Sequence, residues 1–137
     1  MSEIIFKVES NLDPSEFIDV LIRSTLSERR PVDDFERIKE MCENANLIVS
    51  ARENGKLIGV ARSITDFAYC TYLSDLAVDK SYQKKGIGKR LIEETKKASP
   101  KAILILLSAP AAVDYYPKIG MMKLNHCFIL RELDELK

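Results

Sequence analysis

The sequence predicts an α+β fold in which an antiparallel meander leads into a parallel strand pair, with helices on both faces of the sheet. Two strand-like runs at 46–52 and 56–64 are joined around Asn54-Gly55, a strong short signal for a β-hairpin. A third strand-like run, 69–78, would extend this meander after a turn near 65–67. These three runs are the core of the expected sheet.

The region after the meander predicts a βαβ crossover. Residues 87 to 98 place Ile87, Leu91, Thr95 and Ala98 on one face of an amphipathic helix, which Ser99-Pro100 ends. The following run, AILILL at 102–107, has no polar alternation, so we expect a strand buried on both faces. Strands 69–78 and 102–107 would then be parallel neighbours. A short helix at about 110–118 and a last strand pair near 121–130 would complete the fold.

The N-terminal part predicts one strand and two helices. EIIFKVE at 3–9 has the composition of a strand. DPSE at 13–16 resembles a helix start, with Asp13 as N-cap and Glu16 reaching back as in a capping box. The apolar residues expected on the buried sides of the two helices are Phe17, Leu21 and Ile22 in the first and Phe35, Ile38 and Cys42 in the second, which follows Pro31.

Composition limits the class of protein. The 137 residues fit one domain, expected over 1–137, and the 21 basic and 21 acidic residues leave no net charge to attract nucleic acid or an anionic membrane. Three widely spaced cysteines without a CxxC motif predict neither a disulfide framework nor a metal site. No signal peptide and no apolar stretch near 20 residues is evident, so we expect a cytoplasmic protein.

One stretch, VDKSYQKKGIGKRLIEETKK at 78–97, gathers two of the five glycines among basic residues. It lies between an expected strand and the N-terminus of an expected helix, where unpaired N–H groups and the helix dipole favour a phosphate. Glycine allows such N–H groups to turn toward an anion without steric cost. The local basic residues are Lys80, Lys84, Lys85, Lys89 and Arg90. The stretch therefore predicts a phosphate or pyrophosphate ligand, although a glycine turn with solvated lysines remains the plainer alternative.

Two common phosphate motifs do not fit this stretch. A P-loop requires GxxxxGK[ST], but Gly86 and Gly88 stand too close and no Lys-Ser/Thr pair follows. A dinucleotide fold requires a third glycine or alanine where this chain has Leu91.

The stretch LAVDKSYQKKGIGKRLIEE resembles the coenzyme A signature of the GCN5-related N-acetyltransferases, the GNAT family. In that signature a strand ending in L-x-V precedes Q/R-x-x-G-x-G/A, here Gln83, Gly86 and Gly88. A second block, AAVDYYPKIGM at 111–121, resembles the family's A-x-x-x-Y-x-x-x-G-F segment, with Tyr116 at the tyrosine position. The resemblance covers roughly 46–121 and implies a GNAT-like mixed sheet.

The resemblance implies acetyl-CoA as cosubstrate, no metal, and an N-acyltransferase of the EC 2.3.1 type. Backbone groups of Leu76, Ala77 and Val78 would hold the pantetheine arm. The residues implied around the phosphates are Gln83, Lys84, Lys85, Gly86, Ile87, Gly88 and Lys89. A primary amine of a small molecule or peptide would attack the thioester directly, so positioning supplies most of the catalysis.

Two side chains are candidates for proton transfer. Tyr116 matches the family's usual acid, which protonates the departing thiolate. Asp75, just before the pantetheine contacts, is a candidate for the base or for a group that orients the amine. His126 and the three cysteines are expected to have no catalytic role.

Departures from the family pattern leave an alternative open. Ala109 stands where many relatives carry an asparagine that contacts the cofactor, Pro117 removes a helix N–H, and Met121 replaces an aromatic residue. A degenerate member that binds CoA as a sensor or interaction module, without turnover, is therefore a second hypothesis, and an anion-binding domain unrelated to CoA is a third. Phe35, Tyr69 and Tyr72 are candidate walls for the acceptor, whose identity the sequence leaves open, as it does a homodimer.

Overall fold

The computed structural model describes residues 2–137. The chain divides into two units, one ending at Leu107 and the other spanning Ser108–Lys137, and each is described by itself. The expectation of a single domain over 1–137 stays a prediction.

The N-terminal unit contains one five-stranded sheet in the order β1-β2-β3-β4-β5. The strands are β1 (Ile4–Glu9), β2 (Leu47–Glu53), β3 (Lys56–Thr65), β4 (Cys70–Val78) and β5 (Ile103–Ile105). The first four are antiparallel neighbours, and β4 and β5 are parallel. Asn54 and Gly55, both with positive φ, make the tight turn between β2 and β3. The mixed sheet expected from the sequence is confirmed.

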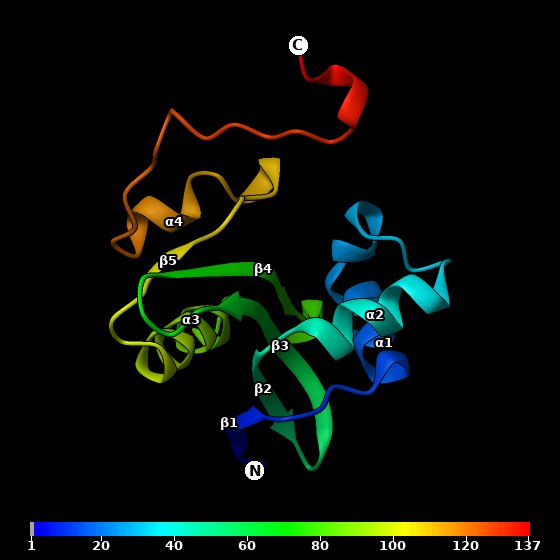
Figure 1. Ribbon diagram of the computed structural model, residues 1–137. Coiled ribbons are helices and arrows are strands. Elements are labelled where there is room, and N and C mark those ends of the chain that lie inside the picture. The colour runs from blue at the N-terminus through cyan, green and yellow to red at the C-terminus, as the bar shows by residue number, and fades with distance from the viewer. Residues whose placement is uncertain (1) are drawn as a thin grey trace. The chain divides into compact units, whose positions relative to one another are not determined.

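Helices cover both faces of this sheet (Figure 1). Helices α1 (Pro14–Ser24) and α2 (Phe35–Asn44) pack on one face, and α3 (Ile87–Ala98) packs on the other. A 3-10 turn, η1 (Leu26–Arg29), lies between α1 and α2, and another, η2 (Lys80–Tyr82), lies between β4 and α3. The helix predicted over 87–98 is confirmed, as is the parallel pairing around it.

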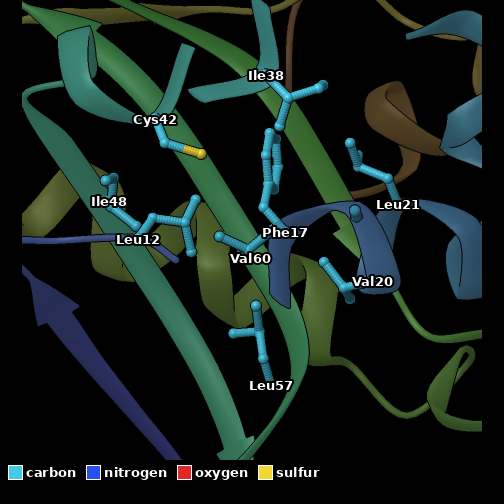
Figure 2. Close-up of a cluster of buried hydrophobic side chains, with 10 residues drawn as sticks. Leu12, Phe17, Val20, Leu21, Ile38, Cys42, Ile48, Leu57 and Val60 are labelled. Atoms are coloured by element: carbon cyan, nitrogen blue, oxygen red, sulfur yellow. The ribbon is translucent and has the colours of Figure 1, made fainter. Parts of the chain in front are cut away.

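A buried apolar cluster holds α1 and α2 to the sheet (Figure 2). Phe17 and Leu21 of α1 and Ile38 of α2 are fully buried against strand residues that include Val60. On the opposite face, Leu91 of α3 packs over β2 and β3. A Cβ at Gly59 would lie 3.2 Å from the Leu91 Cδ1 atom, so this glycine lets α3 approach the sheet closely.

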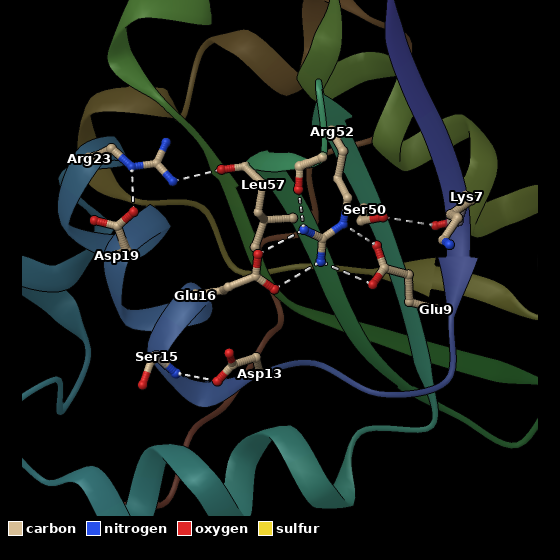
Figure 3. A network of polar contacts seen from close by, with 11 residues as sticks. Lys7, Glu9, Asp13, Ser15, Glu16, Asp19, Arg23, Ser50, Arg52 and Leu57 are labelled. Atoms are coloured by element: carbon tan, nitrogen blue, oxygen red, sulfur yellow. Dashed lines mark hydrogen bonds and ion pairs between the residues drawn. The ribbon is translucent and has the colours of Figure 1, made fainter.

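The start of α1 follows the sequence prediction only in part. The Asp13 carboxylate caps the helix by accepting from the Ser15 N–H at 3.0 Å. Glu16 does not form the expected capping box, because its carboxylate pairs with both Nη atoms of Arg52 at 2.8 and 3.0 Å. The same guanidinium also binds Glu9, which ties β1, β2 and α1 together (Figure 3). Glu16 therefore takes part in a bidentate, charge-assisted pair instead of the cap.

Two residues predicted on buried helix faces are exposed. Ile22 faces solvent and Val20 takes its place in the core. Phe35 is 48% exposed because it is the first residue of α2, before the helix reaches the sheet, whereas Ile38 and Cys42 are buried as expected.

The apolar run 102–107 is not buried on both faces, so that prediction was wrong. Only Ile103–Ile105 is a strand, at the edge of the sheet. Leu104 and Leu106 pack beneath α3, while Ile103 and Ile105 are 52% and 42% exposed. An unbroken apolar run carries no information about which of its faces a helix covers.

The C-terminal unit consists of short turns and extended chain. It contains η3 (Pro110–Ala112), α4 (Tyr115–Lys118) and η4 (Leu133–Glu135). Of these, η3 and α4 lie where the short helix at about 110–118 was expected. The strand pair predicted near 121–130 is not formed, since residues 121–132 contain no strand. Apolar composition alone does not make a strand, which also needs a neighbour to pair with.

Within residues 2–137, no helix has both the length and the apolar character needed to cross a membrane.

Candidate active site

The register between strands β4 and β3 shifts at Ser74, while their pairing stays antiparallel. In the register with β3, Arg62 pairs with Asp75 and Ser63 pairs with Leu73, so Ser74 is an extra residue, a β-bulge. Before the bulge Leu73 faces α3, and after it Ala77 faces α1. Pairing of β4 with β5 is confined to Cys70–Tyr72. Beyond the bulge, β4 has no strand on that side among residues 2–137.

The open edge of β4 carries backbone donors. The Asp79 N–H donates to the Ile58 carbonyl at 2.9 Å, so the alternation of an antiparallel ladder also directs the Ala77 N–H toward β3. The N–H groups of Leu76 and Val78 then point away from β3. Their side chains pack against the cluster beneath α3. These residues present backbone, not side chains, at the edge.

Asp79 fixes the point where the chain leaves β4. Its carboxylate accepts from the Ser81 N–H at 2.8 Å and from Arg23 Nη1 at 2.5 Å. Burial alone would raise the pKa of Asp79, but the Ser81 N–H and the Arg23 guanidinium more than offset it and lower this pKa. Arg23 also donates to the Leu57 carbonyl at 2.6 Å. The end of β4 is therefore attached to both α1 and β3.

The segment from Lys84 to Lys89 gathers backbone N–H groups without partners. Lys84 and Gly86 both have positive φ, 64° and 81°. Gly86 is the N-cap of α3 and provides no side-chain cap, and the first hydrogen bond into the helix is from the Arg90 N–H to the Gly86 carbonyl at 3.0 Å. For the N–H groups of residues 84–89, no acceptor is found within 2–137. The Gln83 side chain is occupied, because its Nε2 donates to the Val78 carbonyl at 2.9 Å.

The basic side chains around this segment differ in whether another group of the protein already engages them. Arg90 pairs with Glu94 at 2.9 Å and lies over the Phe6 ring, and Lys85 lies over the Tyr82 ring. Lys84 and Lys89 are exposed and make no ion pair within the described chain. These two lysines are therefore the free cations nearest the N-terminus of α3.

Asp75 is completely buried, at 0% exposure, beside the bulge. One carboxylate oxygen accepts from Arg30 Nε and the other from Arg62 Nε. Both arginines also bind Ser74, the bulge residue. The side chain of Asp75 points to the face opposite Leu76, as expected, and its oxygens are engaged with cations.

Sequence analysis did not find Arg30, Arg62, Ser74, Asp79 or Arg23, because no local pattern marks contacts between distant segments.

Tyr116 lies on α4 in the C-terminal unit. Its ring packs edge-on against the Tyr115 ring, with centroids 5.2 Å apart. Burial, and to a smaller degree the neighbouring Tyr115, raises the pKa of the Tyr116 phenol. The phenol therefore stays protonated at neutral pH.

Pro117 fits α4 without breaking it. It is the third residue of a one-turn helix, where the backbone N–H would have no partner within the helix. The turn ends in a Schellman motif: the Met121 N–H donates to the Tyr116 carbonyl at 3.0 Å and the Gly120 N–H to the Pro117 carbonyl at 3.1 Å. Gly120 has φ 101°, which this motif requires. The Tyr116 ring thus contacts Tyr115, and its carbonyl accepts from the Met121 N–H.

The tyrosines beside β4 and the three cysteines differ in exposure. Tyr69 and Tyr72 are exposed on or beside β4. Cys42 is buried, and burial raises the pKa of its thiol to about 11, so it is a poor nucleophile. Cys70 and Cys127 are free and exposed. Among residues 2–137, no three His, Cys, Asp or Glu side chains cluster in a way that would hold a metal.

The curated proteins related to this chain in sequence include two that are named N-acetyltransferases. An uncharacterised N-acetyltransferase, ycf52, from Pyropia yezoensis is 28% identical over 103 residues, covering 69% of this chain and 57% of that protein. The chloroplastic GCN5-related N-acetyltransferase 2 of Arabidopsis thaliana is 33% identical over 72 residues, covering 50% and 28%. The matches thus span little more than half of the first relative and under a third of the second.

Solved structures share the fold. A probable acetyltransferase of unknown function from methicillin-resistant Staphylococcus aureus superposes with a TM-score of 0.74 at 20% identity, over 96% of this chain and 100% of that one. The aminoglycoside N-acetyltransferase AAC(6')-Iy, in complex with CoA, gives 0.74 at 15% identity, over 97% of both chains.

The family model described as "Acetyltransferase (GNAT) domain" matches residues 24–129, which is most of the chain and includes β4, the loop before α3 and Tyr116. This chain belongs to the GNAT acetyltransferase family.

Proposed function

We propose that this protein is an N-acetyltransferase that transfers the acetyl group of acetyl-CoA to a primary amine of a small molecule or peptide. The observation that carries the proposal is the continuity of two sets of backbone donors. The open edge of β4 at Leu76 and Val78 leads within a few residues to the unpaired N–H groups of residues 84–89. An extended ligand arm that ends in a pyrophosphate is complementary to that arrangement.

The proposed binding mode uses backbone along most of its length. Leu76, Ala77 and Val78 would hold the pantetheine arm at the strand edge, as an added strand would. The proposed phosphate contacts come from Gln83, Lys84, Lys85, Gly86, Ile87, Gly88 and Lys89. A Cβ built on Gly86 meets no protein atom within 4 Å, so the protein leaves this side of the segment open to a ligand.

The chemistry we propose is direct attack. The amine nitrogen forms a bond to the thioester carbonyl carbon, and the carbon–sulfur bond breaks. An outward N–H of Leu76 or Val78 would donate to the carbonyl oxygen as negative charge develops there. Tyr116 would donate its phenolic proton to the departing thiolate, and its raised pKa keeps that proton available at neutral pH.

For Asp75, the geometry argues against proton abstraction and favours a role in positioning the backbone of β4. A general base needs a free oxygen within reach of the substrate proton. Both oxygens of Asp75 are bound by arginines and the group is fully buried. We therefore propose that the amine loses its proton to water.

The acceptor class is the least specified part of the proposal. Two of the structurally similar proteins are described as aminoglycoside acetyltransferases, one of them in complex with sisomicin. These descriptions support a small-molecule amine in this protein too, and a peptide amine stays in the proposal. A cytoplasmic location belongs to the same proposal and rests on the three free cysteines.

Two measurements test the proposal. The melting temperature is recorded with and without saturating acetyl-CoA, and free CoA thiol is then measured with an aminoglycoside, a polyamine, amino acids and short peptides. We expect stabilisation by acetyl-CoA and thiol release with at least one amine. Stabilisation without release from any amine would favour the CoA-binding module without turnover. A melting temperature unchanged by acetyl-CoA would contradict the proposal.

A further inference from the structure

Two arginines and one aspartate converge on the bulge of β4. We propose that Arg30, Arg62 and Asp75, here called the arginine clamp, are positioning residues that hold the Ser74 bulge and so aim the Leu76 and Val78 N–H groups at the thioester. This inference rests on the proposed function. None of the three residues is assigned contact with the reacting atoms.

The contacts of the clamp are directed at one point of the backbone. Each oxygen of Asp75 receives the Nε of a different arginine. Arg30 Nη2 donates to the Ser74 carbonyl at 2.8 Å, and Arg62 Nη2 donates to the Ser74 hydroxyl at 3.0 Å. Both guanidinium groups thus bind the bulge residue and the carboxylate that follows it. A planar fork with fixed donor directions can impose this geometry, and a lysine cannot.

The bulge determines which N–H groups face the open edge. In a strand, a shift of register by one residue turns every residue to the opposite side. Without the extra residue at Ser74, the N–H groups of Leu76 and Val78 would point toward β3, and that of Ala77 would point outward. The donors proposed to stabilise the thioester oxygen therefore depend on the bulge being kept.

The clamp also connects β4 to a segment far away in sequence. Arg30 immediately follows η1, between α1 and α2, 45 positions before Asp75. Its Nη1 donates to the Arg29 carbonyl at 2.7 Å, and its side chain is 22% exposed. Arg62 comes from β3 and is anchored by the Met41 carbonyl of α2 at 3.0 Å. Within residues 2–137, Asp75 is the only carboxylate paired with either arginine.

The test uses Arg30, the partly exposed member. Amide shifts are recorded by ¹H–¹⁵N correlation NMR for the wild type, Arg30→Gln and Arg30→Lys, each with and without acetyl-CoA. Arg29→Gln is the matched control, because Arg29 is an exposed arginine that makes no ion pair in the described chain. Ser74→Ala, which removes only the Arg62 contact to the hydroxyl, is the milder variant if Arg30→Gln fails to fold.

We expect acetyl-CoA to shift the amides of both 76–78 and 84–89 in the wild type and in Arg29→Gln. In Arg30→Gln and Arg30→Lys, the shift at 76–78 should fall to less than half while that at 84–89 is retained. Ser74→Ala should reduce the shift at 76–78 in the same direction. A full response at 76–78 in Arg30→Lys would overturn the inference, because charge alone would then suffice. If the wild type shows no shift at all, the proposed function itself fails, which is a separate outcome.

Discussion

The segments around Asp75 and around Gly86 differ in whether their polar groups have hydrogen-bond partners within the protein. Around Asp75, carboxylate, guanidinium and serine groups are bound to one another in a buried cluster. Around Gly86, only about ten residues later, the backbone N–H groups have no acceptor in residues 2–137. Buried polar groups without partners are costly, whereas exposed ones are ready to bind. The comparison separates a part that holds the structure from a part that is available to a ligand.

The largest expected effect is a loss of stability when the Asp75 carboxylate is removed from its buried cluster. Asp75→Ala leaves two buried or half-buried guanidinium groups without their carboxylate, and we expect it to lower the free energy of unfolding by about 3–5 kcal/mol. Urea unfolding measures this loss. The control is Glu94→Ala, which removes a partly exposed pair with Arg90 and should cost less than about 1 kcal/mol. Equal losses for the two variants would show that the Asp75 cluster does not hold the structure.

The next effect concerns the proposed acid. Tyr116→Phe should slow acetyl transfer by about 10²-fold or more, the usual contribution of general acid catalysis, with the melting temperature nearly unchanged. Tyr115→Phe, the adjacent tyrosine on α4, is the matched control and should keep most of the rate.

The pH profile sharpens the same prediction. Because burial raises the pKa of Tyr116 above its ordinary value of 10.0, the neutral phenol persists below that pH. The wild-type rate should therefore fall only once the pH rises past the ordinary tyrosine value, and Tyr116→Phe should lack that alkaline fall. An alkaline fall retained in Tyr116→Phe would assign it to another group.

A smaller effect tests whether the exposed donors serve a ligand. Gly86 and Gly55 share a φ of 81°, and a Cβ at either meets no protein atom within 4 Å. Alanine at each should therefore strain the backbone equally, by about 1–2 kcal/mol. Gly86→Ala should in addition weaken acetyl-CoA binding about tenfold, equivalent to ~1.4 kcal/mol, because its methyl group enters the proposed phosphate site. Calorimetric titration measures this, and equal affinities in both variants would argue against the site.

The smallest effect concerns single cations. Lys84→Ala or Lys89→Ala should weaken acetyl-CoA binding by only about twofold to fivefold, since exposed charges contribute up to roughly 1 kcal/mol. The difference from wild type should shrink as salt is added. Lys97→Ala, at the opposite end of α3 and paired with Glu93, should leave the affinity unchanged. A loss in Lys97→Ala as large as in Lys84→Ala would indicate a non-specific charge effect.

The parts of the fold that were predictable are those with local signals. Asn54-Gly55 fixes a hairpin by its own backbone preference, and the spacing of Ile87, Leu91 and Thr95 defines the buried face of α3. The signature glycines indicated where α3 begins, and Gly86 is indeed its N-cap. Each of these signals lies within a few residues of the feature that it predicts.

The parts that were missed depend on distant segments. Arg30 and Asp75 meet across 45 positions, and the Ser74 bulge has no sequence mark beyond the partners that hold it. Ile103 and Ile105 were expected to be buried, but an apolar run does not reveal whether a second layer covers it. Phe128 is 92% exposed, so the apolar residues of the strand pair predicted near 121–130 likewise did not reveal whether another layer covers them. Pairing and coverage are properties of neighbours rather than of the segment itself.

We propose that residues 84–89 hold the pyrophosphate of acetyl-CoA while the edge of β4 holds its pantetheine arm. Titrating the wild-type protein with acetyl-CoA and, in parallel, with acetyl-pantetheine tests this most directly, because the second ligand lacks the pyrophosphate. We predict one acetyl-CoA bound per chain and an affinity for acetyl-pantetheine at least about tenfold weaker, a difference of ~1.4 kcal/mol. Equal affinities, or no binding of acetyl-CoA, would contradict the claim.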